Sequence, residues 1–214
     1  MGLVVCVLLL GVGACSMRGA RAEASASASA SASAAVARAE QGIADANASA
    51  TASREAALSP ELRAQRDAAL AEPAPDKPPQ MNEETAEGAA ASVGYFLDLY
   101  RYAFMTGNTT ELETISEDQC VFCKSVIDRA AELHKGGGWT NRWDQEIMNV
   151  RYYEKLEGYN YNLVHVHINY GQIISYYQNA SPNVTEAIEG QELKFGVHYV
   201  NGKWMIGEGE VVNK

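Results

Sequence analysis

The distribution of aromatic residues constrains this chain more than any other feature of its sequence. All of them (3 Trp, 11 Tyr and 4 Phe) lie from Tyr95 onward in a chain of 214 residues. The stretch from Ser16 to about Gln80 is dominated by Ala, Ser, Glu, Arg and Pro, so it cannot bury enough apolar surface to offset its chain entropy. We therefore predict a single folded domain over residues 82–214, preceded by a disordered tether over residues 16–81.

The predicted domain is strongly acidic. Residues 82–214 contain 10 Lys and Arg against 19 Asp and Glu, which gives this range a formal net charge of −9. Such a domain repels both a phosphate backbone and an anionic lipid surface, and it has no basic stripe with interleaved aromatic residues. We expect no nucleic-acid partner, and any attachment to a membrane has to come from the N-terminus.

An apolar run at the N-terminus, Leu3 to Ala14, is too short for a durable transmembrane helix. Its 12 residues would span roughly 18 Å as a helix, whereas a bilayer core needs about 20 residues. This length is typical of a signal peptide. Because no Lys or Arg precedes the run, we expect the natural start of the chain to lie upstream.

The apolar run ends in the sequence Val-Gly-Ala-Cys-Ser, with the cysteine at Cys15. This motif resembles the bacterial lipobox, which places an aliphatic residue and two small residues before an obligatory Cys. The resemblance implies a signal peptide over residues 1–15, a diacylglyceryl group on the thiol of Cys15 and cleavage just before that residue. We therefore expect a protein at the extracytoplasmic face of the cell membrane, held by acyl chains at about 0.8 kcal/mol per buried CH₂.

The expected tether varies in composition along its length. Ala24–Ala35 is a low-complexity alternation of Ala and Ser, and four prolines between residues 73 and 79 stiffen the last stretch. Between them, residues 54–71 are rich in Ala, Leu, Glu and Arg, and this composition favours transient helix formation.

Apolar residues at helical spacing predict three helices in the first part of the domain. The first extends over residues 82–105, with glutamates at its start as the helix dipole favours. A short helix over residues 111–115 follows, and a third begins near residue 117 and ends before Gly136. The apolar stripe of the first helix consists of Val93, Phe96, Leu97, Tyr100 and Phe104.

After Gly138 the hydrophobic period changes to two, which is typical of strands. We expect strands within residues 139–156, 161–177, 193–199 and 203–212, with Asn201-Gly202 as a tight hairpin turn. The predicted fold class is α+β, with three N-terminal helices packed on a curved antiparallel sheet of about four strands.

The order of these elements, closing on the sequence HYVNGKWMIGE, resembles the cone-shaped fold shared by SnoaL-like, ketosteroid-isomerase-like and nuclear-transport-factor-like proteins. The segments YFLDLYRYAFMTGN and ISEDQCVFCKSVID also resemble an actinobacterial lipoprotein family of unknown function. The resemblance covers about residues 82–214 and implies a cone-shaped domain. It implies no activity, because this fold hosts isomerases, dehydratases and non-catalytic binding modules.

Four cysteines occur in the chain, and two of them remain in the predicted domain. Cys6 leaves with the signal peptide and Cys15 carries the lipid, so Cys120 and Cys123 form a CxxC motif in an oxidising compartment. We predict a disulfide that braces the start of the third helix. The alternative is a thioredoxin-like redox pair, but the acidic residues just before the motif disfavour a thiolate. Two cysteines are too few for a structural zinc site.

Three histidines fall on predicted strands and raise the question of a metal site. His165 and His167 share one face of a strand, and His198 lies on another strand. Because the same face also carries Asn169 and lies opposite the apolar face, solvent exposure explains these residues equally well. We predict no metal ion and no cofactor.

Tyr95, Asp98 and Tyr102 are spaced to lie near one another on the first helix, and they are the candidate pocket residues of the domain. In a ketosteroid-isomerase-like site, Tyr and Asp side chains in an apolar pocket donate hydrogen bonds to an oxyanion. Asp98 could act in this way only if it faced a pocket, and solvent exposure is the competing interpretation. We therefore predict no catalytic residue.

Together these features predict a lipid-anchored extracytoplasmic domain that acts as a non-catalytic binding module. Its expected partners are the membrane, through the lipid on Cys15, and a cell-envelope protein or cell-wall component. The alternative function is that of a SnoaL-like enzyme or a carrier of a small apolar ligand. A deep apolar pocket with convergent polar groups favours the alternative, whereas a filled interior with an exposed apolar patch favours the binding module.

Overall fold

The computed structural model describes residues 16–177 and 181–212 of the chain. The chain divides into two compact units, Met1–Ser53 and Arg54–Lys214, and each unit is described here by itself. The predicted signal peptide, including the lipidation residue Cys15, lies outside the described residues.

A single long helix, α1 (Ser16–Ala57), contains the described part of the first unit. Residues 31–53 of this helix are all exposed, so its helicity comes from composition rather than from packing. Alanine has the highest helix propensity of all residues, which accounts for a helix in a range where the sequence predicted no regular structure. None of the helices among the described residues is long and apolar enough to cross a membrane.

The second unit begins with the last turn of α1 and with helix α2 (Pro60–Leu70). The start of α2 follows the usual rules for a helix N-terminus. Ser59 is the N-cap residue, and its Oγ accepts a hydrogen bond from the backbone N–H of Leu62 at 3.2 Å. Pro60 occupies the first helical position, where its missing N–H costs nothing.

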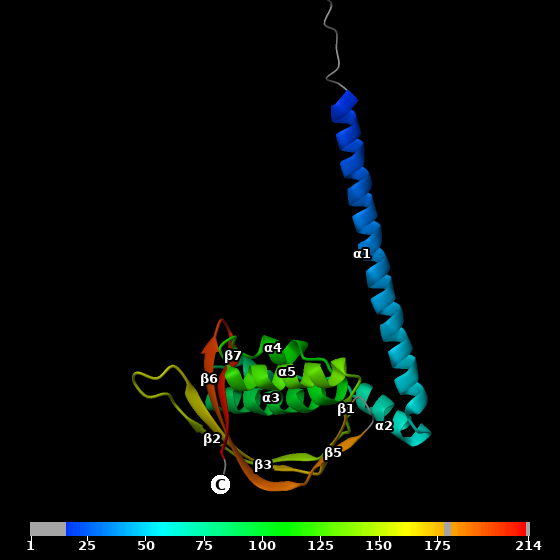
Figure 1. The fold of residues 1–214 in the computed structure, drawn as a ribbon. Coiled ribbons are helices and arrows are strands. Elements are labelled where there is room, and N and C mark those ends of the chain that lie inside the picture. Colours follow the sequence, from blue (N-terminus) through cyan, green and yellow to red (C-terminus); the bar gives the residue numbers. More distant parts are fainter. Residues whose placement is uncertain (1–15, 178–180, 213–214) are drawn as a thin grey trace, which may run out of the picture. The chain divides into compact units, whose positions relative to one another are not determined.

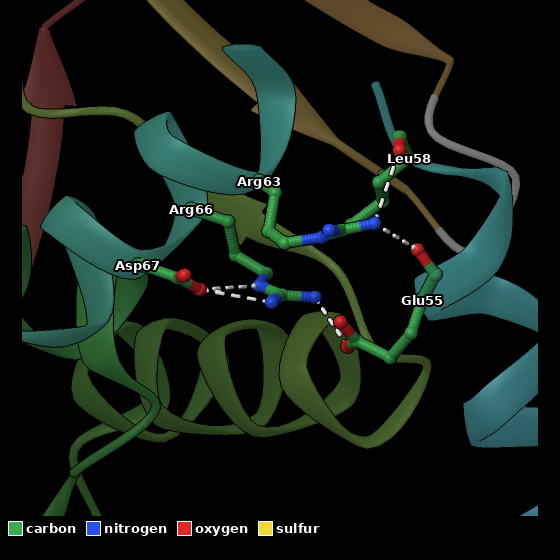
Figure 2. Close-up of polar contacts among 5 residues, drawn as sticks. All are labelled: Glu55, Leu58, Arg63, Arg66 and Asp67. Atoms are coloured by element: carbon green, nitrogen blue, oxygen red, sulfur yellow. Dashed lines mark hydrogen bonds and ion pairs between the residues drawn. The ribbon is translucent and has the colours of Figure 1, made fainter. Parts of the chain in front are cut away.

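Two arginines of α2 bind residues just before the helix, within the second unit, as Figure 2 shows. Arg63 donates to the carbonyl oxygens of Glu55 at 3.0 Å and of Leu58 at 3.4 Å. Arg66 forms ion pairs with the carboxylates of Glu55 and, at 2.8 Å, of Asp67. These contacts tie the first residues of the second unit, residues 54–58, to α2.

Helix α2 belongs to the folded unit because Ala69, and Leu58 just before the helix, are buried. Leu58 and Ala69 pack in one cluster with Trp139, Trp143 and Tyr176. The structure therefore begins the compact unit at Arg54, whereas the sequence predicted a domain start at residue 82. Residues 54–81 contain too few apolar side chains to form a core alone, but two buried tryptophans from later in the chain provide the missing surface.

The predicted helices of the domain are present, and they follow the short 3₁₀ helix η1 (Pro79–Asn82). The longest, α3, is capped at both ends: Thr85 Oγ1 accepts from the N–H of Gly88 at 3.0 Å, and Gly107 ends the helix at a φ of 80°. With α1 and α2, the described residues contain five α-helices rather than three. The three that the sequence predicted are α3 (Ala86–Thr106), α4 (Thr110–Thr114) and α5 (Val121–Lys135).

The strands form two antiparallel sheets, where the sequence predicted one sheet of about four strands. The division occurs at Gly171, whose N–H donates to the carbonyl of Asp144 at 2.8 Å, so the single strand expected over residues 161–177 is split in two. The larger sheet has the order β2-β3-β6-β7, with β2 (Gln145–Tyr153), β3 (Asn162–Tyr170), β6 (Ile188–Val200) and β7 (Lys203–Val212). The smaller sheet has the order β1-β4-β5, with β1 (Trp139–Thr140), β4 (Ile173–Tyr176) and β5 (Pro182–Thr185).

The main core lies between the helices and the four-stranded sheet. Figure 1 shows α3, α4 and α5 gathered on one side of strands that curve beneath them. Phe96, Phe122 and Phe195 meet in this layer, with ring centroids 5.6 to 6.2 Å apart. Val164, Val166 and Ile168 of β3 face them and are fully buried. Side chains therefore fill the space between the helices and the sheet.

Candidate functional site

A polar cleft lies on the outside of this core, between the proline-rich segment over residues 72–76 and helix α3. Its volume is about 270 Å³, just below the usual range of roughly 300–1,000 Å³ for small-molecule sites. The proline-rich segment forms one wall, and α3 and the loop between β1 and β2 form the other. The cleft is lined by Glu72, Pro73, Ala74, Pro75, Asp76, Asp98, Arg101, Tyr102 and Arg142.

Asp98 is one of three carboxylates that line the cleft, and its hydrogen bonds are weak. The Nη2 of Arg101 and the Nε2 of Gln145 lie 3.5 and 3.4 Å from its Oδ1. Burial raises the pKa of Asp98, and the charge of Arg101 opposes that rise. The carboxylate is partly desolvated but lacks a close donor, so it retains capacity to accept a hydrogen bond from a ligand.

Both signs of charge converge on the cleft. The side chain of Arg101 is only 18% exposed, and its contact with Asp98 is long. Arg142, from the loop before β2, forms an ion pair with Glu72. The cleft therefore contains positive and negative groups, some in close ion pairs and some in long ones. Such a cleft suits a polar or zwitterionic ligand, such as a stretch of peptide, better than an apolar one.

The three candidate pocket residues have different positions. Asp98 and Tyr102 line the cleft, whereas Tyr95 is buried and is not among the lining residues. Burial, with the nearby charges of Glu111 and Asp76, raises the pKa of Tyr95. The lining of the cleft is mainly charged, unlike the apolar pocket of a ketosteroid-isomerase-like site.

Sequence reasoning did not identify several groups at the cleft. Glu72 and Arg142 are far apart in the chain and meet only through the fold. Gln145, at the start of β2, does not line the cleft but contacts Asp98, and its buried Oε1 has no hydrogen-bond partner among the described residues. The one feature of the sequence that pointed to the cleft was the run of prolines, because prolines favour the extended backbone that forms one wall of it.

Cys120 and Cys123 form a disulfide at the start of α5. Both residues are only 1% exposed, and the Sγ of Cys120 accepts from the N–H of Cys123 at 3.1 Å as the N-cap of the helix. Thiol–disulfide exchange requires access of a thiolate to a sulfur atom, and burial denies that access. The geometry supports a structural disulfide rather than a redox pair.

A second polar cluster joins the loop after α4 to the sheet. The carboxylate of Glu117 is 11% exposed, and its two oxygens bind the Nε2 of His198 at 2.8 Å and the hydroxyl of Tyr161 at 2.7 Å. The ring of Tyr161 stacks on that of His198, with centroids 5.4 Å apart. The hydrogen bond to Glu117 is the main cause of a raised pKa of Tyr161. Each polar group of this cluster has a partner, which is typical of a structural role.

The other two strand histidines, His165 and His167, lie on the outer face of the sheet, with Glu192 3.5 Å from the Nδ1 of His165. Burial lowers the pKa of His165, and the neighbouring Lys194 adds to the effect. In the part of the chain that the structure describes, no group of three His, Cys, Asp or Glu side chains could hold a metal ion.

Comparison with protein families gives a match over residues 64–210 to a model described as "Family of unknown function (DUF6318)". Comparison with curated proteins gives no match. Among solved structures, the chain is similar to the crystal structure of the intermembrane space region of chloroplast protein ARC6, with 18% sequence identity and a TM-score of 0.46. That similarity covers 62% of this chain and 99% of the other.

Proposed function

We propose that this chain, which belongs to the DUF6318 family of unknown function, is a lipid-anchored extracytoplasmic protein whose domain is a non-catalytic binding module. In this proposal a lipid on Cys15 holds the protein at the outer face of the cell membrane. We also propose that the chain is related to actinobacterial lipoproteins and that its fold is a variant of the SnoaL-like cone.

The disulfide supports the proposed compartment. A disulfide persists in oxidising surroundings and is rare in proteins of a reducing cytoplasm. The bond between Cys120 and Cys123 is buried at the first turn of α5, where it ties the helix to the loop before it. The lipobox-like motif at Cys15 and this bond therefore point to the same side of the membrane.

The proposal of a binding module depends on one contrast. The interior is filled with side chains, whereas polar groups with long hydrogen bonds lie together in an outer cleft. Three phenylalanine rings occupy the layer between the helices and the sheet, so the interior favours the binding module over a carrier of an apolar ligand. The cleft instead presents Asp98, Arg101 and Tyr102. We propose that it binds a polar segment of a cell-envelope protein or cell-wall component.

Metabolic labelling with an alkyne fatty acid tests the anchor. The full chain is expected to incorporate the label and to fractionate with membranes. Cys15→Ala is expected to abolish incorporation, because the thiol is the only proposed attachment point. Cys6→Ala is the matched control and should label like the unchanged chain. Label retained in Cys15→Ala would place the lipid elsewhere and reject this part of the proposal.

Site-specific photocrosslinking tests the cleft. A photoreactive phenylalanine analogue replaces Tyr102 in the cleft or, as the matched control, the exposed Tyr159 in the loop between β2 and β3. We expect a discrete adduct in intact cells from position 102 only, and Asp98→Asn combined with Arg101→Gln should weaken it. Equal adducts at both positions, or none at position 102, would rule out the cleft as the binding site.

A further inference from the structure

The four-stranded sheet has two edges, and the chain itself covers one of them. Ser116 forms a parallel bridge with Ile206 of the edge strand β7. The N–H of Glu117 donates to the carbonyl of Ile206 at 2.9 Å, and the N–H of Ile206 donates to the carbonyl of Ile115 at 2.8 Å. The backbone groups of β7 that face outward at this point are therefore already bonded.

The other edge strand, β2, is open. It pairs with β3 on one side only, and no strand of the described residues lies along its other side. Every residue from Glu146 to Arg151 is exposed, including Met148 at 56%. An exposed strand of this length presents a row of unpaired backbone donors and acceptors and is a template for pairing with another chain.

The register of β2 with β3 shows which face each residue of the edge strand occupies. Ile147 and Val150 lie opposite the buried Ile168 and Val166, so these two share the inner, apolar face. Glu146 and Arg151 lie opposite Asn169 and His165 and so share the outer, polar face. A bulge at Met148 keeps the pattern in phase along the strand. In the described chain neither Glu146 nor Arg151 has an ion-pair partner.

We propose that β2 pairs antiparallel with β2 of a second copy of this chain, with Glu146 opposite Arg151. A twofold axis perpendicular to the sheet generates this pairing and makes the contact self-complementary. The same register places Ile147 opposite Val150 on the inner face. Because side chains alternate between faces, a slip by one residue would place charged residues opposite apolar ones.

The charge pattern and the apolar pattern of β2 together indicate that a second copy of this chain pairs with its open edge. Each interface contains two Glu146–Arg151 pairs on the outer face and two Ile147–Val150 pairs on the inner face, and directly opposite pairs are the unit of sheet stabilisation. The two copies would form one continuous eight-stranded sheet. This inference requires neither the lipid on Cys15 nor a ligand in the cleft.

Charge reversal tests the register. Sedimentation equilibrium of the full chain in a density-matched detergent should give the mass of two copies. Glu146→Arg alone, or Arg151→Glu alone, places like charges opposite each other twice per interface and should weaken the dimer about 10-fold. The double variant Glu146→Arg/Arg151→Glu restores opposite charges and should recover the dimer. A monomeric wild-type chain, or a dimer unaffected by either single change, would overturn the proposal.

Cysteine crosslinking gives a second readout that does not depend on the strength of association. With Cys6 and Cys15 replaced by Ser, the full chain with Glu146→Cys and Arg151→Cys should form a covalent dimer on mild oxidation. The two positions are about 17 Å apart along one strand, too far to bond within one copy. Arg151→Cys with Tyr153→Cys, also on the outer face, is the control and should stay monomeric. Crosslinking of both variants alike, or of neither, would reject this register.

Discussion

The two edges of the four-stranded sheet differ in what covers them, and the difference separates stability from association. At the β7 edge, the loop over residues 115–117 adds backbone hydrogen bonds and the Glu117–Tyr161–His198 cluster, and Ile206 is fully buried. At the β2 edge, Val150 is 37% exposed and no strand of the described chain covers it. The closed edge therefore contributes to the free energy of folding, whereas the open edge is available to a partner.

Truncation of one aliphatic side chain at each edge should give the largest contrast. Ile206→Ala removes buried methyl groups from the closed edge and should lower the free energy of unfolding by about 3 kcal/mol. In the monomer, Val150→Ala at the open edge should lower it by less than about 1 kcal/mol, because the side chain is already partly hydrated. Urea denaturation of both variants, at protein concentrations too low for dimers to form, measures the contrast. Equal losses in the monomer would show that another part of the same chain covers β2.

The polar contacts of the two edges should differ by a smaller amount. The carboxylate of Glu117 accepts a hydrogen bond from Tyr161 and forms an ion pair with His198. Glu117→Gln removes its charge and should lower the free energy of unfolding by about 1–3 kcal/mol. Glu146→Gln at the open edge should change it by no more than about 0.5 kcal/mol. The same denaturation experiment compares them, and the comparison fails if Glu146→Gln is the more costly change.

Removal of the disulfide tests how firmly the closed edge is braced. The Sγ of Cys123 lies 3.8 Å from the carbonyl of Ile206, so the bond lies directly beside β7. The double change Cys120→Ser/Cys123→Ser should cost about 2 kcal/mol, near the low end for disulfides, because the sequence separation is only 3 residues. Since both sulfurs are buried, a mild reductant should leave the folded wild type intact. Rapid reduction of the folded protein would instead indicate an accessible redox pair.

The smallest effect is expected at Asp98, which contacts Gln145 at the start of the open edge. Its pKa is raised by burial, so the ionised carboxylate opposes folding at neutral pH, and this cost disappears as the pH falls below the ordinary value of 3.8. Asp98→Asn should therefore raise the melting temperature at pH 7 by about 1 °C, since the carboxylate is half exposed. No gain is expected at pH 3.5. A gain that grows in acid would contradict the assigned direction of the shift.

The sequence was sufficient to predict the elements whose apolar pattern is long and regular. The stripe on α3 and the alternation in β3 led directly to the observed helix and strand, and the two cysteines of the domain led to the observed bond. The residues of the cleft could be predicted only in part from the sequence. Asp98 and Tyr102 share a helix and were grouped by spacing, but Glu72 and Arg142 meet across 70 residues of chain and no local pattern joins them.

Two features were decided by tertiary contacts alone. Helix α2 lacks an apolar face strong enough to predict a packed helix, and it is held because Trp139 and Trp143 bury Leu58 and Ala69. The smaller sheet exists because strand pairing is interrupted at Gly171, whose N–H donates to the carbonyl of Asp144, where an unbroken strand was expected.

By itself, the sequence determined the α+β class, the order of the three domain helices and the later strands, and the disulfide, because periodicity and cysteine spacing are local properties of the chain. Only the tertiary structure decided where the folded unit begins, how the strands divide into two sheets and which sheet edge stays open. These outcomes depend on which distant side chains meet and bury one another, and hydrophobic burial is non-directional, so no local pattern encodes them.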